Sequence, residues 1–186
     1  MSFNFENPSK VFAWFYSLFC PFYGRKYYKE LLKELELDGS ESVLDFGSGT
    51  GVLAKKVSKK LSHDGHLTCL DLSEAFLNTV RKKLQKSTNI TYILGDIREK
   101  NIPIDSFDII LITWVIHHLE NDNRFEVIQK VVNSLKADGK IYVIEYISTP
   151  HGIHEEILIE LFRKMGFSER LVYKRKNTCL YEFKRI

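Results

Sequence analysis

Residues 42–54, SVLDFGSGTGVLA, decide the fold of this chain. The opening SVLDF is apolar apart from its first residue and Asp45, and it predicts a short buried strand. Gly47, Gly49 and Gly51 follow at alternate positions. Glycine costs about 0.5–1 kcal/mol inside a regular element, so this cluster indicates that the main chain comes close to something bulky. The stretch therefore predicts a strand, a ligand-binding turn and the start of a helix.

Composition and charge place the chain among ordinary globular proteins. Its 186 residues, 44% of them hydrophobic, are enough for one well-buried α/β domain. The net charge of +3 is too small to indicate a dedicated nucleic-acid binder. Three widely spaced cysteines indicate neither a disulfide framework nor a zinc site, and we expect free thiols in the cytoplasm. The apolar stretch 11–24 is shorter than the roughly 20 residues of a transmembrane helix, so we expect no membrane span.

From residue 42 onward, apolar runs typical of strands alternate with helical periodicity. Strands are predicted at 42–46, 66–72, 90–95, 107–116, 140–147, 169–176 and 178–186. Helices are predicted at 8–20, 24–37, 51–61, 73–86, 121–136 and 152–167. We expect Ser73 to cap the start of its helix, and Gly139 to cap the end of the helix at 121–136.

This alternation predicts an α/β fold: a doubly wound, Rossmann-like sheet of seven strands, mostly parallel, with a C-terminal antiparallel hairpin. Such sheets bind ligands at the carboxyl ends of their strands, where the strand order reverses. Asp71, Asp96, Thr113 and Trp114 end successive strands, so we expect them beside the glycine loop. Residues 39–186 are predicted to form this domain, and residues 1–38 a helical lid.

The glycine spacing discriminates between classes of nucleotide ligand. A dinucleotide fingerprint would require a third glycine at Val52, and no Walker lysine follows the loop. Asp45 lies two residues before the first glycine, where an acid would repel a pyrophosphate. A ligand with an amine and a cationic centre would instead be favoured there. Asp45 and Val52 therefore disfavour a nicotinamide-dependent oxidoreductase.

Four segments in chain order resemble the class I S-adenosylmethionine-dependent methyltransferases: VLDFGSGTGVLA, LTCLDLSEAF, ILGDI and FDIILITWVIHHL. The resemblance covers about residues 40 to 186. The opening segment FAWFYSLFCPFYGRKYYKELL more loosely resembles ubiquinone/menaquinone-biosynthesis-like methyltransferases and their small-molecule relatives. The resemblance implies S-adenosyl-L-methionine as the cofactor.

The resemblance also implies a role for each matching residue. Asp71 would accept hydrogen bonds from both ribose hydroxyls, Leu72 would pack on the adenine, Asp96 would accept from the adenine amine, and the Ile97 amide would support the ring. Gly47, Ser48 and Gly49 would let the main chain pass beside the methionine part, and Asp45 would face its amino group. The Thr113 carbonyl and the Trp114 segment would close the methionine side, and Gly51 would belong to the same cofactor-binding loop. Either Asp71 or Asp96 alone could instead cap a helix, and Gly51 could serve helix packing only.

His117 and His118 follow the fourth strand and are the candidate catalytic residues. Histidine is a natural base at neutral pH, and a base is needed where the methyl acceptor must lose a proton. One of the two could instead cap or pack the next segment. A metal site built with Glu145 or Glu155 is an alternative for this region, but we expect none.

The aromatic N-terminal segment is the candidate wall of the acceptor site, with Tyr16, Phe19, Tyr23 and Tyr27 as substrate-contacting residues. A lid of this kind would exclude water and select a flat or apolar acceptor. Two alternatives are ordinary core packing and peripheral contact with a membrane surface.

We therefore expect transfer of a methyl group to a small, apolar or aromatic molecule by a monomer or homodimer. The sequence TWVIHH after strand four lacks the Pro-Pro-aromatic pattern of amino-group methylases of DNA and protein glutamine. The basic runs fall mainly on outward helix faces, so we expect no nucleic-acid partner, and RNA methylation is a lesser alternative. A non-catalytic partner or activator protein of the same fold is the rival from another class.

Overall fold

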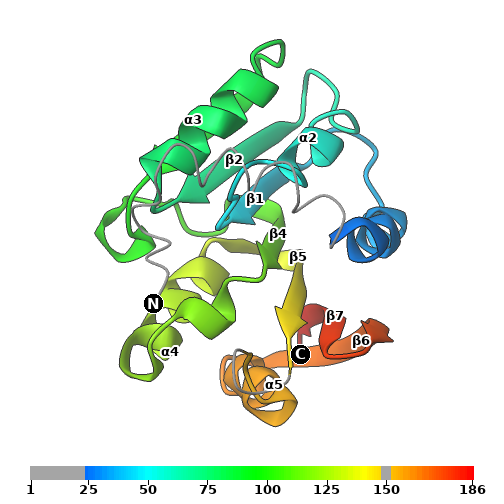
Figure 1. The fold of residues 1–186 in the computed structure, drawn as a ribbon, viewed down its shortest axis with the longest axis vertical. Coiled ribbons are helices and arrows are strands. Elements are labelled where there is room, and N and C mark those ends of the chain that lie inside the picture. Colours follow the sequence, from blue (N-terminus) through cyan, green and yellow to red (C-terminus); the bar gives the residue numbers. More distant parts are fainter. Residues whose placement is uncertain (1–23, 148–151) are drawn as a thin grey trace.

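The computed structural model describes residues 24–147 and 152–186. In this part of the chain one sheet of seven strands runs in the order β3-β2-β1-β4-β5-β7-β6 (Figure 1). The strands are β1 (Ser42–Phe46), β2 (His66–Asp71), β3 (Ile90–Leu94), β4 (Phe107–Thr113), β5 (Leu135–Tyr146), β6 (Phe167–Arg175) and β7 (Thr178–Arg185).

Strand pairing confirms the predicted topology. β1 pairs in parallel with β2 on one side and with β4 on the other, so the strand order reverses beside β1. β3 and β5 extend the parallel sheet outward, and β7 pairs antiparallel with both β5 and β6. The carboxyl ends of β1 and β4 therefore border the place where a doubly wound sheet binds its ligand.

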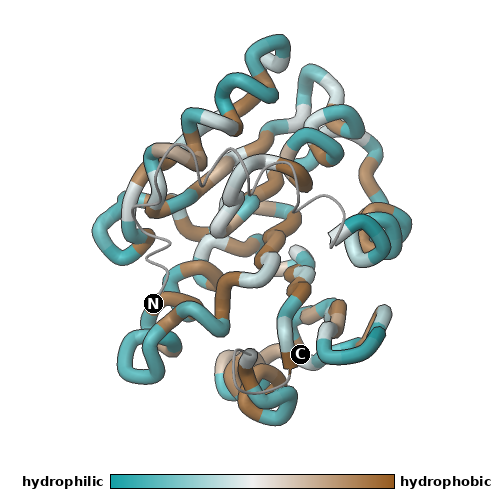
Figure 2. Tube along the Cα trace, viewed as in Figure 1, coloured by the Kyte–Doolittle hydropathy of each residue, from teal (hydrophilic) through white to brown (hydrophobic). Residues whose placement is uncertain are grey.

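Helices cover both faces of the sheet. They are α2 (Ala54–Val57), α3 (Glu74–Lys83), α4 (Asn121–Asn133) and α5 (Glu155–Arg163), with 3-10 turns η1 (Ile97–Glu99) and η2 (Ile116–His118). Residues 24–34 are also helical. Because strand side chains alternate between faces, Leu44 packs with α4 and α5, whereas Val43 packs with α2, α3 and the helix at 24–34. Figure 2 shows hydrophobic residues concentrated in the strands and hydrophilic ones in the peripheral loops.

The helix at 24–34 shares the core of the sheet. Tyr27, Tyr28 and Leu31 are buried in the cluster that covers this face. At its end, Glu34 pairs with Arg170 of β6 at 2.7 Å. The predicted helix at 8–20 lies outside the described part of the chain. The same is true of residues 1–23 of the lid predicted at 1–38, so that lid stays a prediction.

Three local predictions were wrong. Gly139 does not cap a helix, because α4 ends at Asn133 and Gly139 lies inside β5. β4 ends at Thr113 rather than at residue 116, since Trp114 adopts a left-handed φ of 55° that breaks the strand. The helix expected at 51–61 is regular only over Ala54–Val57. By contrast, the Ser73 cap is confirmed, with its hydroxyl accepting from the Phe76 amide at 3.3 Å.

Candidate functional site

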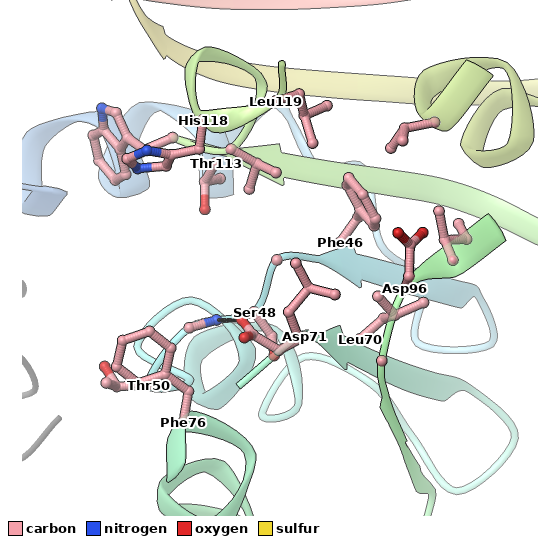
Figure 3. Close-up of a pocket in the computed structure, with 18 of the residues that line it drawn as sticks. Phe46, Ser48, Thr50, Leu70, Asp71, Phe76, Asp96, Thr113, His118 and Leu119 are labelled. Atoms are coloured by element: carbon pink, nitrogen blue, oxygen red, sulfur yellow. Dashed lines mark hydrogen bonds between the residues drawn. The ribbon is translucent and has the colours of Figure 1, made fainter. Parts of the chain in front are cut away.

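A cavity of about 560 Å³ lies at the carboxyl ends of β1, β2, β3 and β4 (Figure 3). It is bordered by the loop after β1, the turn after β3, the turn after β4 and the start of α4. Ten of the residues predicted for the site line it: Gly47, Ser48, Gly49, Asp71, Leu72, Asp96, Ile97, Thr113, Trp114 and His118. Residues as far apart in the chain as Gly47 and His118 therefore meet at one end of the sheet.

The glycine loop forms one wall of the cavity with its main chain. Gly47 and Gly49 have φ values of 71° and 51°, which side-chain-bearing residues rarely adopt. A Cβ atom on Gly47 would lie 2.3 Å from Cγ2 of Val115, whereas a Cβ on Gly49 would meet nothing within 4 Å. The loop is held by the Gly47 and Ser48 amides, which donate to the Leu70 carbonyl at 2.8 and 3.0 Å. The main chain at Gly49 therefore faces open space in the cavity.

Asp71, the last residue of β2, connects the loop to the next helix. Its Oδ2 accepts from the Gly49 amide at 2.7 Å and its Oδ1 accepts from the Ser73 amide at 2.8 Å. Burial raises the pKa of Asp71, and these two amide hydrogen bonds oppose the rise. Each oxygen retains acceptor capacity, so the carboxylate can receive two further donors in the cavity.

Asp45 is buried in β1 and does not line the cavity. The side chain is 1% exposed, and neither carboxylate oxygen has a hydrogen-bond partner among the described residues. Burial, with the nearby Asp71 carboxylate as a second cause, raises the pKa of Asp45 to about 7. An unpaired buried carboxylate costs free energy that a nearby cation would recover.

The far end of the cavity carries a second acid. Asp96 caps η1 by accepting from the Arg98 amide at 2.8 Å, and the Arg98 guanidinium approaches Oδ2 to 2.6 Å. This pairing lowers the pKa of Asp96, so the group is ionised. Leu72 is 46% exposed and lines the cavity, which leaves an apolar surface for a flat ring.

Trp114, in the turn after β4, also lines the cavity. Its ring is held by edge contacts with Tyr27 and Tyr28, at centroid distances of 6.1 and 5.5 Å. Tyr28 lines the cavity, but Tyr27 does not, and its hydroxyl donates to the Arg175 carbonyl at 2.6 Å. Tyr27 thus lies behind the wall that we predicted it to form. Tyr16, Phe19 and Tyr23 lie outside the described residues.

The two histidines have different surroundings. His118 lines the cavity, and burial together with the neighbouring His117 ring lowers its pKa to about 4. It is therefore neutral at physiological pH and a weaker base than the sequence suggested. His117 does not line the cavity, and its Nδ1 lies 2.5 Å from Oε1 of the buried Glu145. Gly51 also lies outside the lining, where a Cβ would meet Val80 at 3.0 Å.

Sequence reasoning missed several residues of the site. Phe46, Val115 and Leu119 flank predicted positions, and this adjacency was the available signal. Tyr28 belongs to the aromatic segment that was predicted to form a wall of the site, and it does line the cavity. Other missed residues reach the site from separate elements and gave no local signal: Phe76, Asn123 and Val127. The described residues hold no group of three or more potential metal ligands, and no helix among them is long and apolar enough to cross a bilayer.

A family model described as a methyltransferase domain matches residues 43–139. This chain belongs to the methyltransferase-domain family. Its fold is that of the class I S-adenosylmethionine-dependent methyltransferases, as the four sequence segments predicted.

Curated relatives of this methyltransferase domain include proteins named as N-methyltransferases and as C-methyltransferases. The phosphoethanolamine N-methyltransferase of Plasmodium falciparum (isolate 3D7) is 28% identical over 121 residues, which cover 65% of this chain and 45% of that protein. The ubiquinone/menaquinone biosynthesis C-methyltransferase of Vibrio vulnificus (strain YJ016) is 31% identical over 134 residues, or 68% of this chain and 50% of that protein. The chain spans about half the length of the curated relatives it matches.

Solved structures share the fold of this methyltransferase domain over most of its length. A TehB-like methyltransferase from Corynebacterium glutamicum aligns with a TM-score of 0.76 and 16% identity, covering 96% of this chain and 100% of that one. The N-methyltransferase NodS from Bradyrhizobium japonicum WM9, solved with S-adenosyl-L-homocysteine, aligns with a TM-score of 0.73 and 18% identity, covering 87% and 86%.

Proposed function

We propose that this domain binds S-adenosyl-L-methionine in the cavity at the strand ends and transfers its methyl group to a small apolar or aromatic acceptor. The observation that carries the proposal is the joint placement of Asp71 and Gly49 at one cavity wall, with the amide of the glycine fixing the carboxylate at 2.7 Å. Family membership and fold support the same cofactor.

The lining residues fit the cofactor at three points. Asp71 has acceptor capacity for two ribose hydroxyls, and the exposed side chain of Leu72 offers a surface for the adenine. Asp96 is ionised at the far end and would accept from the adenine amine. Asp45 comes two residues before the glycine loop and its carboxylate is unpaired among the described residues, so the cationic methionine part would reduce the cost of its burial.

When bound, the cofactor supplies a methyl group already activated on a positively charged sulfur. The residues of the chain then have to align the acceptor with that carbon and keep water out. Tyr28, Phe76 and Trp114 provide aromatic walls for this purpose. His118 is neutral at physiological pH, so it would orient a hydroxyl or amine of the acceptor by hydrogen bonding. It would not keep a proton taken from the acceptor. Tyr16, Phe19 and Tyr23 remain predicted contacts of the acceptor.

Removing the Asp71 carboxylate tests the proposal. We expect Asp71→Ala to weaken binding of S-adenosyl-L-homocysteine by about 1–3 kcal/mol, because hydrogen bonds to a charged acceptor are lost. Isothermal titration calorimetry of the full chain measures this difference. Asp64→Ala is the matched control, since Asp64 is an exposed loop acid outside the cavity. Unchanged affinity in Asp71→Ala would remove this residue from the site, and saturable binding of NADH by the wild type would revive the oxidoreductase alternative.

A further inference from the structure

Glu145, near the end of β5, is fully buried, and its carboxylate is surrounded by hydrogen-bond donors. Oε1 accepts from the Tyr146 amide at 2.8 Å and lies 2.5 Å from Nδ1 of His117. Oε2 accepts from the amides of Ile116 and His117 at 2.8 and 3.3 Å. A carboxylate offers about four lone-pair positions, and each of them has a partner here. Such complete pairing is the condition under which a buried charge is tolerated.

The hydrogen bonds around Glu145 suit a donor on the His117 ring. Main-chain amides only donate, so both carboxylate oxygens act as acceptors. An ionised carboxylate then requires His117 to carry its proton on Nδ1, a tautomer that follows from the hydrogen-bond network. His118 in the same turn, Arg124 from α4 and Cys179 from β7 also interact electrostatically with this pair. The Tyr146 ring lies beside that of His117, with the two centroids 5.6 Å apart.

The turn that Glu145 holds is a wall of the cavity. Val115 and His118 both line the cavity, and Val115 packs so closely on Gly47 that a Cβ there would lie 2.3 Å from its Cγ2. The centroids of the His118 and His117 rings are 3.9 Å apart. A movement of this turn would therefore displace two lining side chains and the contact with the glycine loop. Glu145 itself does not line the cavity, so any influence on a ligand is indirect.

We propose that Glu145 is a positioning residue of the cofactor site. Through its bonds to Ile116 and His117 it holds the turn after β4 against Gly47, and so sets the space for the methionine part of the cofactor. The proposal rests on the proposed function, because that function gives the cavity its ligand.

Glu145→Gln tests this role, with Glu182→Gln as the matched control. Glu182 is also a buried carboxylate, 3% exposed on the neighbouring strand β7, and it pairs with Arg170 and Tyr142 outside the cavity lining. Both variants replace one buried carboxylate in the same part of the sheet. Titration calorimetry with S-adenosyl-L-homocysteine and with 5′-methylthioadenosine, which lacks the amino-acid part, then separates a change in the cavity from general destabilisation.

We expect Glu145→Gln to weaken S-adenosyl-L-homocysteine about tenfold more than 5′-methylthioadenosine. The wild type should also show a far-downfield proton resonance from Nδ1 of His117 that this variant lacks. Glu182→Gln should lower the melting temperature and leave the ratio of the two affinities unchanged. Equal changes for both ligands in Glu145→Gln would overturn the proposal. Binding of neither ligand by the wild type would instead contradict the proposed function.

A second pair of variants serves if Glu145→Gln does not fold. His117→Asn keeps an N–H donor near the position of Nδ1, whereas His117→Phe removes it and leaves the carboxylate with one donor fewer. We expect His117→Asn to retain the preference for S-adenosyl-L-homocysteine and His117→Phe to lose it. The same preference in both would overturn the positioning role.

Discussion

Asp45 is the side chain of this site whose burial is least compensated. Both of its oxygens lack partners in the described part of the chain, and Asp71 adds a second acid nearby. A residue that only stabilised the fold would not be expected to remain unpaired in this way. The cost is understandable if the site is completed by a cationic ligand, which is the role proposed for Asp45.

Asp45→Asn should change the pH dependence of stability. The pKa of Asp45 rises from 3.8 to about 7 on folding, so the folded protein binds the extra proton between these values and stability falls as pH rises through them. We expect the variant to be more stable than the wild type at pH 8 by about 2–4 kcal/mol, and to differ much less at pH 4. Urea unfolding at both pH values measures this. A variant that is less stable than the wild type at pH 8 would contradict this expectation. The control is Asp64→Asn, which changes an exposed acid.

The titration of His118 provides a second test of the site. Because burial and the His117 ring lower its pKa to about 4, we expect its ring protons to show no titration between pH 6 and 8. Histidine NMR spectra recorded over that range, assigned with His118→Gln, measure the titration directly. A midpoint near 6.5, the ordinary value for histidine, would restore the general-base role that the sequence suggested.

The loop between β1 and α2 depends on glycine for two separable reasons. Gly47 needs a left-handed φ and also close contact with Val115, whereas Gly49 needs only the left-handed φ. We therefore expect Gly49→Ala to cost about 1–2 kcal/mol of stability from backbone strain. Gly47→Ala should cost about 1–3 kcal/mol more, because the added Cβ displaces Val115. Thermal unfolding of both variants measures the difference, and equal losses would show that the contact with Val115 is not tight.

Elements with a strong local pattern were predictable, and those set by distant contacts were not. The loop at 47–51 and the acid at Asp71 follow from a strand-turn-helix pattern within a few residues. The start of β5 was misplaced because Gly139 resembles a helix cap, although its place in the sheet depends on pairing with β4. The role of Glu145 was invisible because its partners are 28 and 29 residues away in the chain.

At the scale of the whole molecule, the reversal of strand order beside β1 is what assembles the site. β1 has β2 on one side and β4 on the other, so the loop after β1 meets Asp71 from one neighbour and the turn after β4 from the other. α4 and α5 cover one face and the helix at 24–34 with α2 and α3 the other (Figure 1). The cavity lies at the strand ends, where the first turns of α3 and α4 contribute Phe76 and Asn123 to its lining.

A crystal structure of the full chain soaked with S-adenosyl-L-homocysteine tests the central claim most directly. The account predicts ribose hydroxyls on the Asp71 carboxylate, adenine between Leu72 and Asp96, and the amino-acid part beside Gly47 and Gly49. Density for the compound elsewhere on the protein, with the strand-end cavity holding a different ligand, would contradict it.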